Sequence, residues 1–231
     1  MLGTIVNATA IILGGALGLL FGHAMPEKMN STIMQGLGLA VLLVGIDMAL
    51  QTNNSLVVIG SLVIGGVIGE WIDIEKKLKS FGTWMENKFI SGEDGRFTRA
   101  FISASLIYCI GAMSITGAIE SGIKGNHSIL MVKSLIDGTT AIVFATSMGA
   151  GVLASAIPVL LYQGAITLAA GLLQNVLSQP IITEMSATGG LLIVGIGLNI
   201  LQIKEIKVGN LLPGIFVAIP LSLLFAALYP V

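Results

Sequence analysis

Residues 131–151, MVKSLIDGTTAIVFATSMGAG, decide how this chain folds. The stretch opens with Lys133 and Asp137 and continues almost entirely in apolar and small residues. A run of this kind is typical of a helix that spans a bilayer in about 20 residues. Charged side chains at membrane depth are costly and therefore need a reason. Whether this stretch crosses the membrane determines the number of crossings, and hence the topology.

The composition places the chain in a membrane. Of its 231 residues, 55% are hydrophobic and only 10% are charged, whereas soluble domains carry about 25% charged residues. We therefore expect an integral membrane protein with one membrane domain over residues 1–231. The net charge of −1 gives no overall field to attract nucleic acid. One cysteine, Cys109, and two separated histidines, His23 and His127, predict no disulfide, no metal site and no cofactor.

Apolar windows of spanning length predict an all-α bundle of about eight transmembrane helices. The windows fall at residues 2–22, 33–50, 55–72, 100–119, 133–150, 152–174, 187–203 and 208–229. The first window has no positive residue before it, so we expect a retained helix rather than a cleaved signal peptide. The window at 133–150 is the most polar, and the sequence allows a full span, a broken helix or a re-entrant segment there.

The basic residues favour a true crossing at 133–150. With eight crossings and both termini outside, nine of the eleven basic residues fall on the inner side, where positive residues are preferred. The inner residues would be Lys28, Lys76, Lys77, Lys79, Lys88, Arg96, Arg99, Lys204 and Lys207. Residues 99 and 204 share a side only if an even number of crossings separates them, and four crossings meet this condition.

The polar stretch at 73–98 predicts a cytoplasmic amphipathic connector. Apolar residues recur there at intervals of three or four, at Ile74, Leu78, Phe81, Met85 and Phe89. This spacing is typical of a helix on the membrane surface, where Trp84 suits the headgroup level. The turn residues SGEDG at 91–95 then end the helix. A solvated connector is the alternative interpretation.

Two stretches resemble each other, GLGLAVLLVGIDMAL at 36–50 and TGGLLIVGIGLNIL at 188–201. Aligning Gly45 with Gly197 places Asp47 opposite Asn199, whereas aligning Gly45 with Gly195 matches Val-Gly-Ile in both. The stretches belong to the second and seventh windows, so the copies would run in opposite directions. We therefore predict an inverted repeat of spans 1–3 and 6–8 around spans 4 and 5, a common construction of secondary transporters.

Glycines recur at the four-residue spacing that lets membrane helices approach closely. Gly14, Gly18 and Gly22 lie in the first window, and Gly65 and Gly69 lie in the third. We expect packing surfaces, either within the subunit or between subunits of a homo-oligomer. The small residues at 147–151 could also mark a break in a helix.

Polar residues at membrane depth form the candidate substrate or ion site. Lys133 and Asp137 share one helical face, about 6 Å apart along its axis. They are either a purely structural pair or the charged part of a site for a small solute or ion. The other candidates are Thr139 and Thr140 in the fifth span, Ser114 and Thr116 in the fourth, Gln163 in the sixth, Asn7 in the first, Asp47 in the second and Asn199 in the seventh.

Several stretches of the chain resemble the DUF554 family of bacterial membrane proteins, also called the YqgA-like or YdfK-like proteins. They are GTIVNATAIILGGALG, IGAMSITGAIESG, KSLIDGTTAIVFATSMGAGVLAS and YQG. The resemblance covers nearly the whole chain, and GAMSITGA and KSLIDG are its most specific parts. It implies a multi-pass protein of the bacterial cytoplasmic (inner) membrane that is suspected to be a transporter. It brings no catalytic residues to this chain.

We expect a secondary, ion-coupled transporter of a small solute, with spans 4–6 lining the site. The enzyme motifs G-x-x-x-x-G-K-[ST], H-E-x-x-H and G-x-S-x-G do not occur, so we do not expect an enzyme. A channel or passive pore and a non-transporting membrane scaffold are the alternatives. A continuous polar lining would favour the channel, a closed polar site would favour the carrier, and polar groups that satisfy one another would favour the scaffold.

Overall fold

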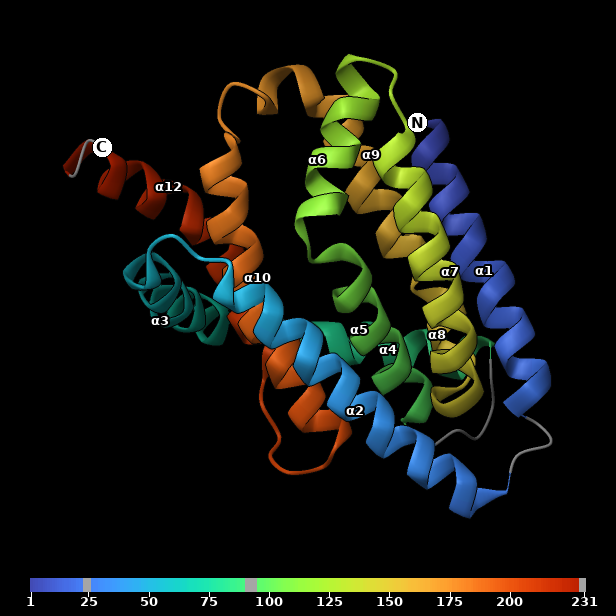
Figure 1. Ribbon diagram of the computed structural model, residues 1–231. Coiled ribbons are helices and arrows are strands. Elements are labelled where there is room, and N and C mark those ends of the chain that lie inside the picture. The colour runs from blue at the N-terminus through green and yellow to red at the C-terminus, as the bar shows by residue number, and fades with distance from the viewer. Residues whose placement is uncertain (23–25, 90–94, 229–231) are drawn as a thin grey trace. The chain divides into compact units, whose positions relative to one another are not determined.

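The computed structural model describes residues 1–22, 26–89 and 95–228. His23 and most of the predicted SGEDG turn lie outside these ranges. Within them every regular element is an α-helix, which confirms the predicted all-α class (Figure 1). The helices are α1 (Leu2–Gly22), α2 (Glu27–Leu50), α3 (Ser55–Ile72), α4 (Ile74–Phe89), α5 (Arg96–Cys109), α6 (Ala112–Ile123), α7 (Ser128–Met148), α8 (Gly151–Ala154), α9 (Ala156–Leu173), α10 (Gln179–Ile200), α11 (Val208–Leu211) and α12 (Pro213–Leu228).

The helix break lies in the fourth predicted span rather than the fifth. Among the described residues, seven long helical stretches are apolar enough to cross a membrane, and α5 and α6 form a bent pair with an angle of 61° between them. Gly111 stands at the bend with φ 143°, a conformation that residues with a Cβ rarely adopt. In contrast, α7 runs unbroken through Lys133 and Asp137. The alternatives of a broken or re-entrant fifth segment are therefore wrong.

Helix directions support counting the bent pair as one crossing. Along α1 and α7, Gly3 faces Leu130, Gly14 faces Gly138, Gly18 faces Ile142 and Gly22 faces Thr146. The residue numbers rise together, so the two helices run parallel. Parallel spans require an odd number of crossings between them. Because α2 and α3 are each long enough to cross, α5 and α6 together supply the third crossing and bring the total to eight.

The ends of the bent pair agree with this count. At the start of α5, the Arg96 guanidinium donates a hydrogen bond to the Ser147 carbonyl at the end of α7, at 2.9 Å. In α6, Gly117 lies against Leu130, near the start of α7. The pair therefore covers the length of α7 in the opposite direction, as a broken span does and a re-entrant loop does not.

The described chain divides into two compact units. The first holds the described residues within 1–35, 79–109 and 113–174, and the second holds those within 36–78, 110–112 and 175–228. The single membrane domain over residues 1–231 stays a prediction.

Glycines hold the first unit together. A methyl group at Gly14 or Gly18 would overlap the backbone carbonyl of Gly138 or Ile142, so α1 and α7 approach to backbone contact. Ile11 lies on the same face of α1, four residues after Asn7, and is fully buried. This face points Asn7 at α7, which positions the candidate site described below.

The second unit is built from antiparallel pairs. Gly45 of α2 lies against the carbonyl of Gly190 in α10, and Gly65 of α3 lies against Gly214 of α12. Gly69 of α3 packs on Asn210 of the short helix α11, which directly precedes α12. The glycine motifs are thus packing surfaces within the chain, which is one of the two alternatives that the sequence left open. The homo-oligomer stays a prediction.

The predicted repeat copies contact each other pairwise. Helix α2 pairs with α10 and α3 pairs with α12, each antiparallel. In the first unit, α1 pairs with α9 through Asn7 and Gln163. An inverted repeat would place counterpart helices in this way, but contact is not similarity of shape, and the inverted repeat stays a prediction.

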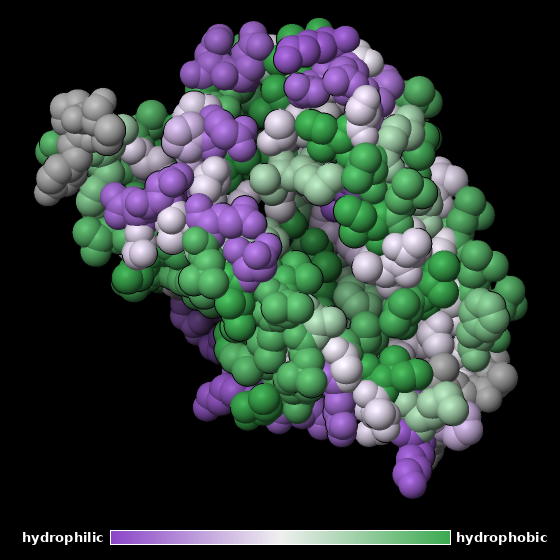
Figure 2. Space-filling model, viewed as in Figure 1, coloured by the Kyte–Doolittle hydropathy of each residue, from purple (hydrophilic) through white to green (hydrophobic). Residues whose placement is uncertain are grey.

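Large apolar side chains lie on the outside of the helices. Leu135 of α7, Leu168 and Leu172 of α9 and Trp71 of α3 are all more exposed than buried. Figure 2 shows broad hydrophobic areas on the face in view. Exposed apolar surface of this extent is expected where lipid covers a protein. The burial pattern therefore agrees with an integral membrane protein.

Helix α4 occupies most of the predicted connector. Met85 is buried against Phe97 and Phe101, whereas Phe81 and Trp84 are exposed and stack with ring centroids 5.9 Å apart. Phe81 and Met85, which the apolar spacing places on one face, thus differ in exposure, and the amphipathic connector stays a prediction. Its place on the cytoplasmic membrane surface stays a prediction.

Candidate functional site

The Lys133–Asp137 pair is buried inside the first unit. Lys133 Nζ lies 2.9 Å from Oδ1 and 2.8 Å from Oδ2 of Asp137, and the two residues are only 7% and 3% exposed. The equally spaced pair Glu120 and Lys124 has side chains that are 27% and 67% exposed. Since water screens the second pair and not the first, only Lys133 and Asp137 interact at low dielectric.

Asn7 brings α1 to this pair. Its Nδ2 donates a hydrogen bond to Oδ2 of Asp137 at 3.0 Å, and the residue is fully buried. The glycine contacts farther along the same face hold α1 close enough for a short side chain to reach. Asn7 is therefore placed by the packing of α1 and not by its own flexibility.

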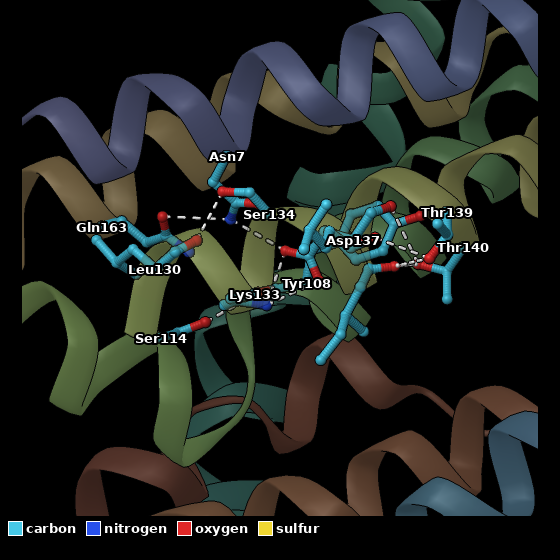
Figure 3. A network of polar contacts seen from close by, with 12 residues as sticks. Asn7, Tyr108, Ser114, Leu130, Lys133, Ser134, Asp137, Thr139, Thr140 and Gln163 are labelled. Atoms are coloured by element: carbon cyan, nitrogen blue, oxygen red, sulfur yellow. Dashed lines mark hydrogen bonds and ion pairs between the residues drawn. The ribbon is translucent and has the colours of Figure 1, made fainter. Parts of the chain in front are cut away.

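Gln163 brings α9 to the same place. Its Oε1 accepts from Asn7 Nδ2 at 3.4 Å. Nearby on the same two helices, the hydroxyls of Thr4 and Thr167 lie 3.4 Å apart. We call Asn7, Lys133, Asp137 and Gln163 the polar cluster; Figure 3 shows these four residues from α1, α7 and α9.

Two amide atoms of the polar cluster have no hydrogen-bond partner within the described chain. They are Oδ1 of Asn7 and Nε2 of Gln163. Their orientation is fixed, because the Asp137 carboxylate needs a donor from Asn7, and the nitrogen of Asn7 then faces the oxygen of Gln163. The cluster therefore keeps one buried acceptor and one buried donor open, and its formal charge is zero.

Tyr108 is a neighbouring residue that the sequence analysis missed. It is almost completely buried, and its ring stacks on Phe144 with centroids 6.2 Å apart. Its carbonyl accepts a hydrogen bond from the Ser114 hydroxyl at 3.0 Å, which links α5 to α6 across the break. A tyrosine in the middle of an apolar segment was the available signal.

The remaining predicted residues lie outside the cluster's hydrogen bonds. The hydroxyls of Thr139 and Thr140 bond to carbonyls of their own helix, and Thr139 is exposed. Thr116 is half-buried. Asp47 is exposed and accepts from Gln51. Asn199, in the second unit, bonds both the amide and the carbonyl of Ile206.

Two buried carboxylates that the sequence analysis did not select act as helix caps. Glu184 accepts from the Thr52 hydroxyl at 2.5 Å and from the amide of Asn53 at 2.7 Å, just before α3 begins. Glu86 accepts from the amide of Gly95 and the hydroxyl of Thr98 at the start of α5. Carboxylates are favoured at helix N-termini, so both have a structural explanation.

Glu86 is charged under ordinary conditions. Burial raises the pKa of its carboxyl, but hydrogen bonds from the Thr98 hydroxyl and from the amides of Gly95 and Thr98 outweigh burial and hold that pKa below its usual value.

No group of three or more His, Cys, Asp or Glu residues that could hold a metal ion occurs within the described ranges.

Fold and cluster together define a multi-pass α-helical membrane protein with a charge pair buried among its helices. A family model described as "Protein of unknown function (DUF554)" matches residues 2–223, and the chain belongs to this family.

Two relatives match the chain at nearly full length. It is 33% identical over 221 residues to the "Uncharacterized membrane protein YdfK" of Bacillus subtilis (strain 168), covering 94% of this chain and 93% of the relative. It is 32% identical over 231 residues to the "Uncharacterized protein YqgA" of Escherichia coli (strain K12), covering 98% of each. No solved structure matches the chain.

Proposed function

We propose that the protein is a secondary, ion-coupled carrier of a small solute in the bacterial cytoplasmic membrane. The polar cluster is its solute site, and both termini lie outside. The observation that carries the proposal is a buried, charge-neutral ion pair whose amide neighbours keep an open donor and an open acceptor.

A purely structural role explains the cluster less well. Replacing a buried ion pair by apolar residues is often neutral or stabilising, so α7 would insert and pack without these charges. Each buried polar atom left without a partner costs about 1–3 kcal/mol. A scaffold in which the polar groups satisfied one another would avoid that cost, whereas a binding site needs open groups.

The helix break supports the same proposal. Transporters commonly place discontinuous helices at their binding sites, where interrupted backbone lines a cavity. Here the break closely follows the buried Tyr108, and the Ser114 hydroxyl bonds to the Tyr108 carbonyl across it.

The proposal is tested with purified full-length protein in proteoliposomes. A panel of labelled amino acids, amines, organic anions and monovalent cations is offered, and uptake that saturates with solute concentration is expected for at least one. Asp137→Asn should lower that uptake at least tenfold. Glu120→Gln, which breaks the exposed pair of the same spacing, should leave uptake and yield unchanged.

A second variant protects the test against misfolding. Lys133→Met combined with Asp137→Asn removes both charges, so neither is left unpaired in the core. This double variant should fold and should not transport. Undiminished uptake in both variants would remove the charge pair from the mechanism, and flux that never saturates would identify a channel instead.

A further inference from the structure

The charge balance of the polar cluster restricts what it can bind. Lys133 and Asp137 neutralise each other at 2.8 Å in a buried position. A solute with a single charge would pair with one of them and leave the other buried without a counter-charge, which is strongly unfavourable. A solute that carries both charges would pair with both residues and leave no charge unpaired.

We propose that the solute is a small zwitterion with an ammonium and a carboxylate group, such as an α-amino acid. This inference rests on the proposed function, because it takes the polar cluster to be the solute site. The solute's ammonium binds the Asp137 carboxylate, and its carboxylate binds the Lys133 ammonium. The two ion pairs replace the single internal one.

The open amide atoms match this orientation. Asn7 already bonds Asp137 through Nδ2, so its open Oδ1 lies on the same short amide and accepts from the solute's ammonium. Gln163 offers the open donor Nε2, which suits the solute's carboxylate. A zwitterion uses both open atoms, because its ammonium needs the acceptor and its carboxylate needs the donor. A solute with a single charge would use only one of them.

Size follows from the same geometry. The charged groups of an α-amino acid are joined through one carbon, so they match two protein charges that lie in direct contact. The long, flexible side chain of Lys133 allows its ammonium to move aside, whereas Asp137 is held by Asn7 at 3.0 Å. The solute therefore enters between a fixed carboxylate and a movable ammonium.

The experiment measures binding by the purified full-length protein in detergent. The twenty common α-amino acids are screened by thermal shift, since a ligand that binds the native state raises the melting temperature. Each amino acid that binds is then compared by calorimetry with its two fragments. For alanine these are ethylamine, which lacks the carboxylate, and propionate, which lacks the ammonium. Both fragments should bind at least tenfold more weakly than the intact amino acid.

Variants separate binding from folding. Gln163→Leu leaves the ion pair intact and removes the open donor, so zwitterion affinity should fall at least fivefold while the fragment amine is affected less. The neutral double variant Lys133→Met with Asp137→Asn should lose zwitterion binding altogether. Glu120→Gln should bind as the wild type does.

The outcomes distinguish this inference from the transport proposal. An amine or a carboxylate that binds as tightly as the zwitterion overturns the inference, as does a screen in which no amino acid raises the melting temperature. If proteoliposomes then still move a singly charged solute in a manner that depends on Asp137, transport stands and only the inference fails. An amino acid that binds with the expected fragment pattern but is not moved supports the inference and removes the transport proposal.

Discussion

At the scale of residues, burial separates two ion pairs with the same sequence spacing. Lys133 and Asp137 are 2.8 Å apart and buried, whereas Lys124 and Glu120 are 3.4 Å apart and partly in water. Exposed pairs at this spacing contribute a few tenths of a kcal/mol. When a lysine and an aspartate are buried, either charge alone strongly lowers the free energy of unfolding, and the protein tolerates them only as a pair.

The buried pair should therefore show strong coupling in a double-mutant cycle. Asp137→Asn and Lys133→Met should each lower the free energy of unfolding by about 3–5 kcal/mol, because each leaves one buried charge unpaired. The double variant should lie within about 2 kcal/mol of the wild type. Reversible unfolding by SDS in mixed micelles measures all four proteins, with Glu120→Gln as the exposed control. Single effects that simply add would mean that the two charges do not depend on each other.

At the scale of elements, one face of α1 determines the site. Gly14 and Gly18 bring the helix to the backbone of α7, and Asn7 on the same face then meets Asp137. Side chains at those two positions would hold the helices apart. The glycines are thus part of the site's construction, although neither contacts its polar atoms.

Gly14→Ala should separate these two helices. The added methyl group would overlap the carbonyl oxygen of Gly138, so we expect the free energy of unfolding to fall by about 1–3 kcal/mol and solute binding to weaken. Gly171→Ala is the matched control, because Gly171 lies in α9 with nothing within 4 Å of the added carbon. The same micelle assay compares the two. Equal effects at both positions would contradict the close α1–α7 contact.

The site could be predicted in part from the sequence. The charges of Lys133 and Asp137 stand out in an apolar segment, and their spacing alone places them on one face. Asn7 and Gln163 were among ten candidates, but helical periodicity does not say which faces meet. Tyr108 and Glu184 were missed because burial depends on neighbours far along the chain. Gly111 is one of 30 glycines, and only its backbone conformation marks it as the bend.

At the scale of the whole molecule, the topology depends on the bent pair. The count of eight rests on α1 and α7 running parallel and on α5 and α6 together covering the length of α7. The basic residues do not give this number, but they require an even number of crossings between residues 99 and 204, and the eight apolar windows meet that condition. The helix contacts and the loop charges are therefore both consistent with the same path of the chain.

Alkaline phosphatase fusions in a bacterial host test that path, because the enzyme is active only outside the cytoplasm. Fusions after Asn53 and after Gly125 should be active, and fusions after Ser80 and after Lys204 should be inactive. Ser80 and Gly125 flank the bent pair, so opposite results at these two positions identify it as a crossing. The same result at both would make it a re-entrant segment.

The parallel contact between α1 and α7 also bears on how the protein is made. Asn7 and Asp137 are separated by 130 residues, so at 5–20 residues per second the first helix waits roughly 6–26 s for its partner. During that time α1, which carries no charged residue, can rest in lipid while Asn7 and Thr4 lack their partners on α7 and α9. Helix α7 arrives with its lysine and aspartate one turn apart, so the two charges can neutralise each other without a partner helix. The pairing that we assign to solute binding thus also lowers the cost of inserting these two charges with their own helix.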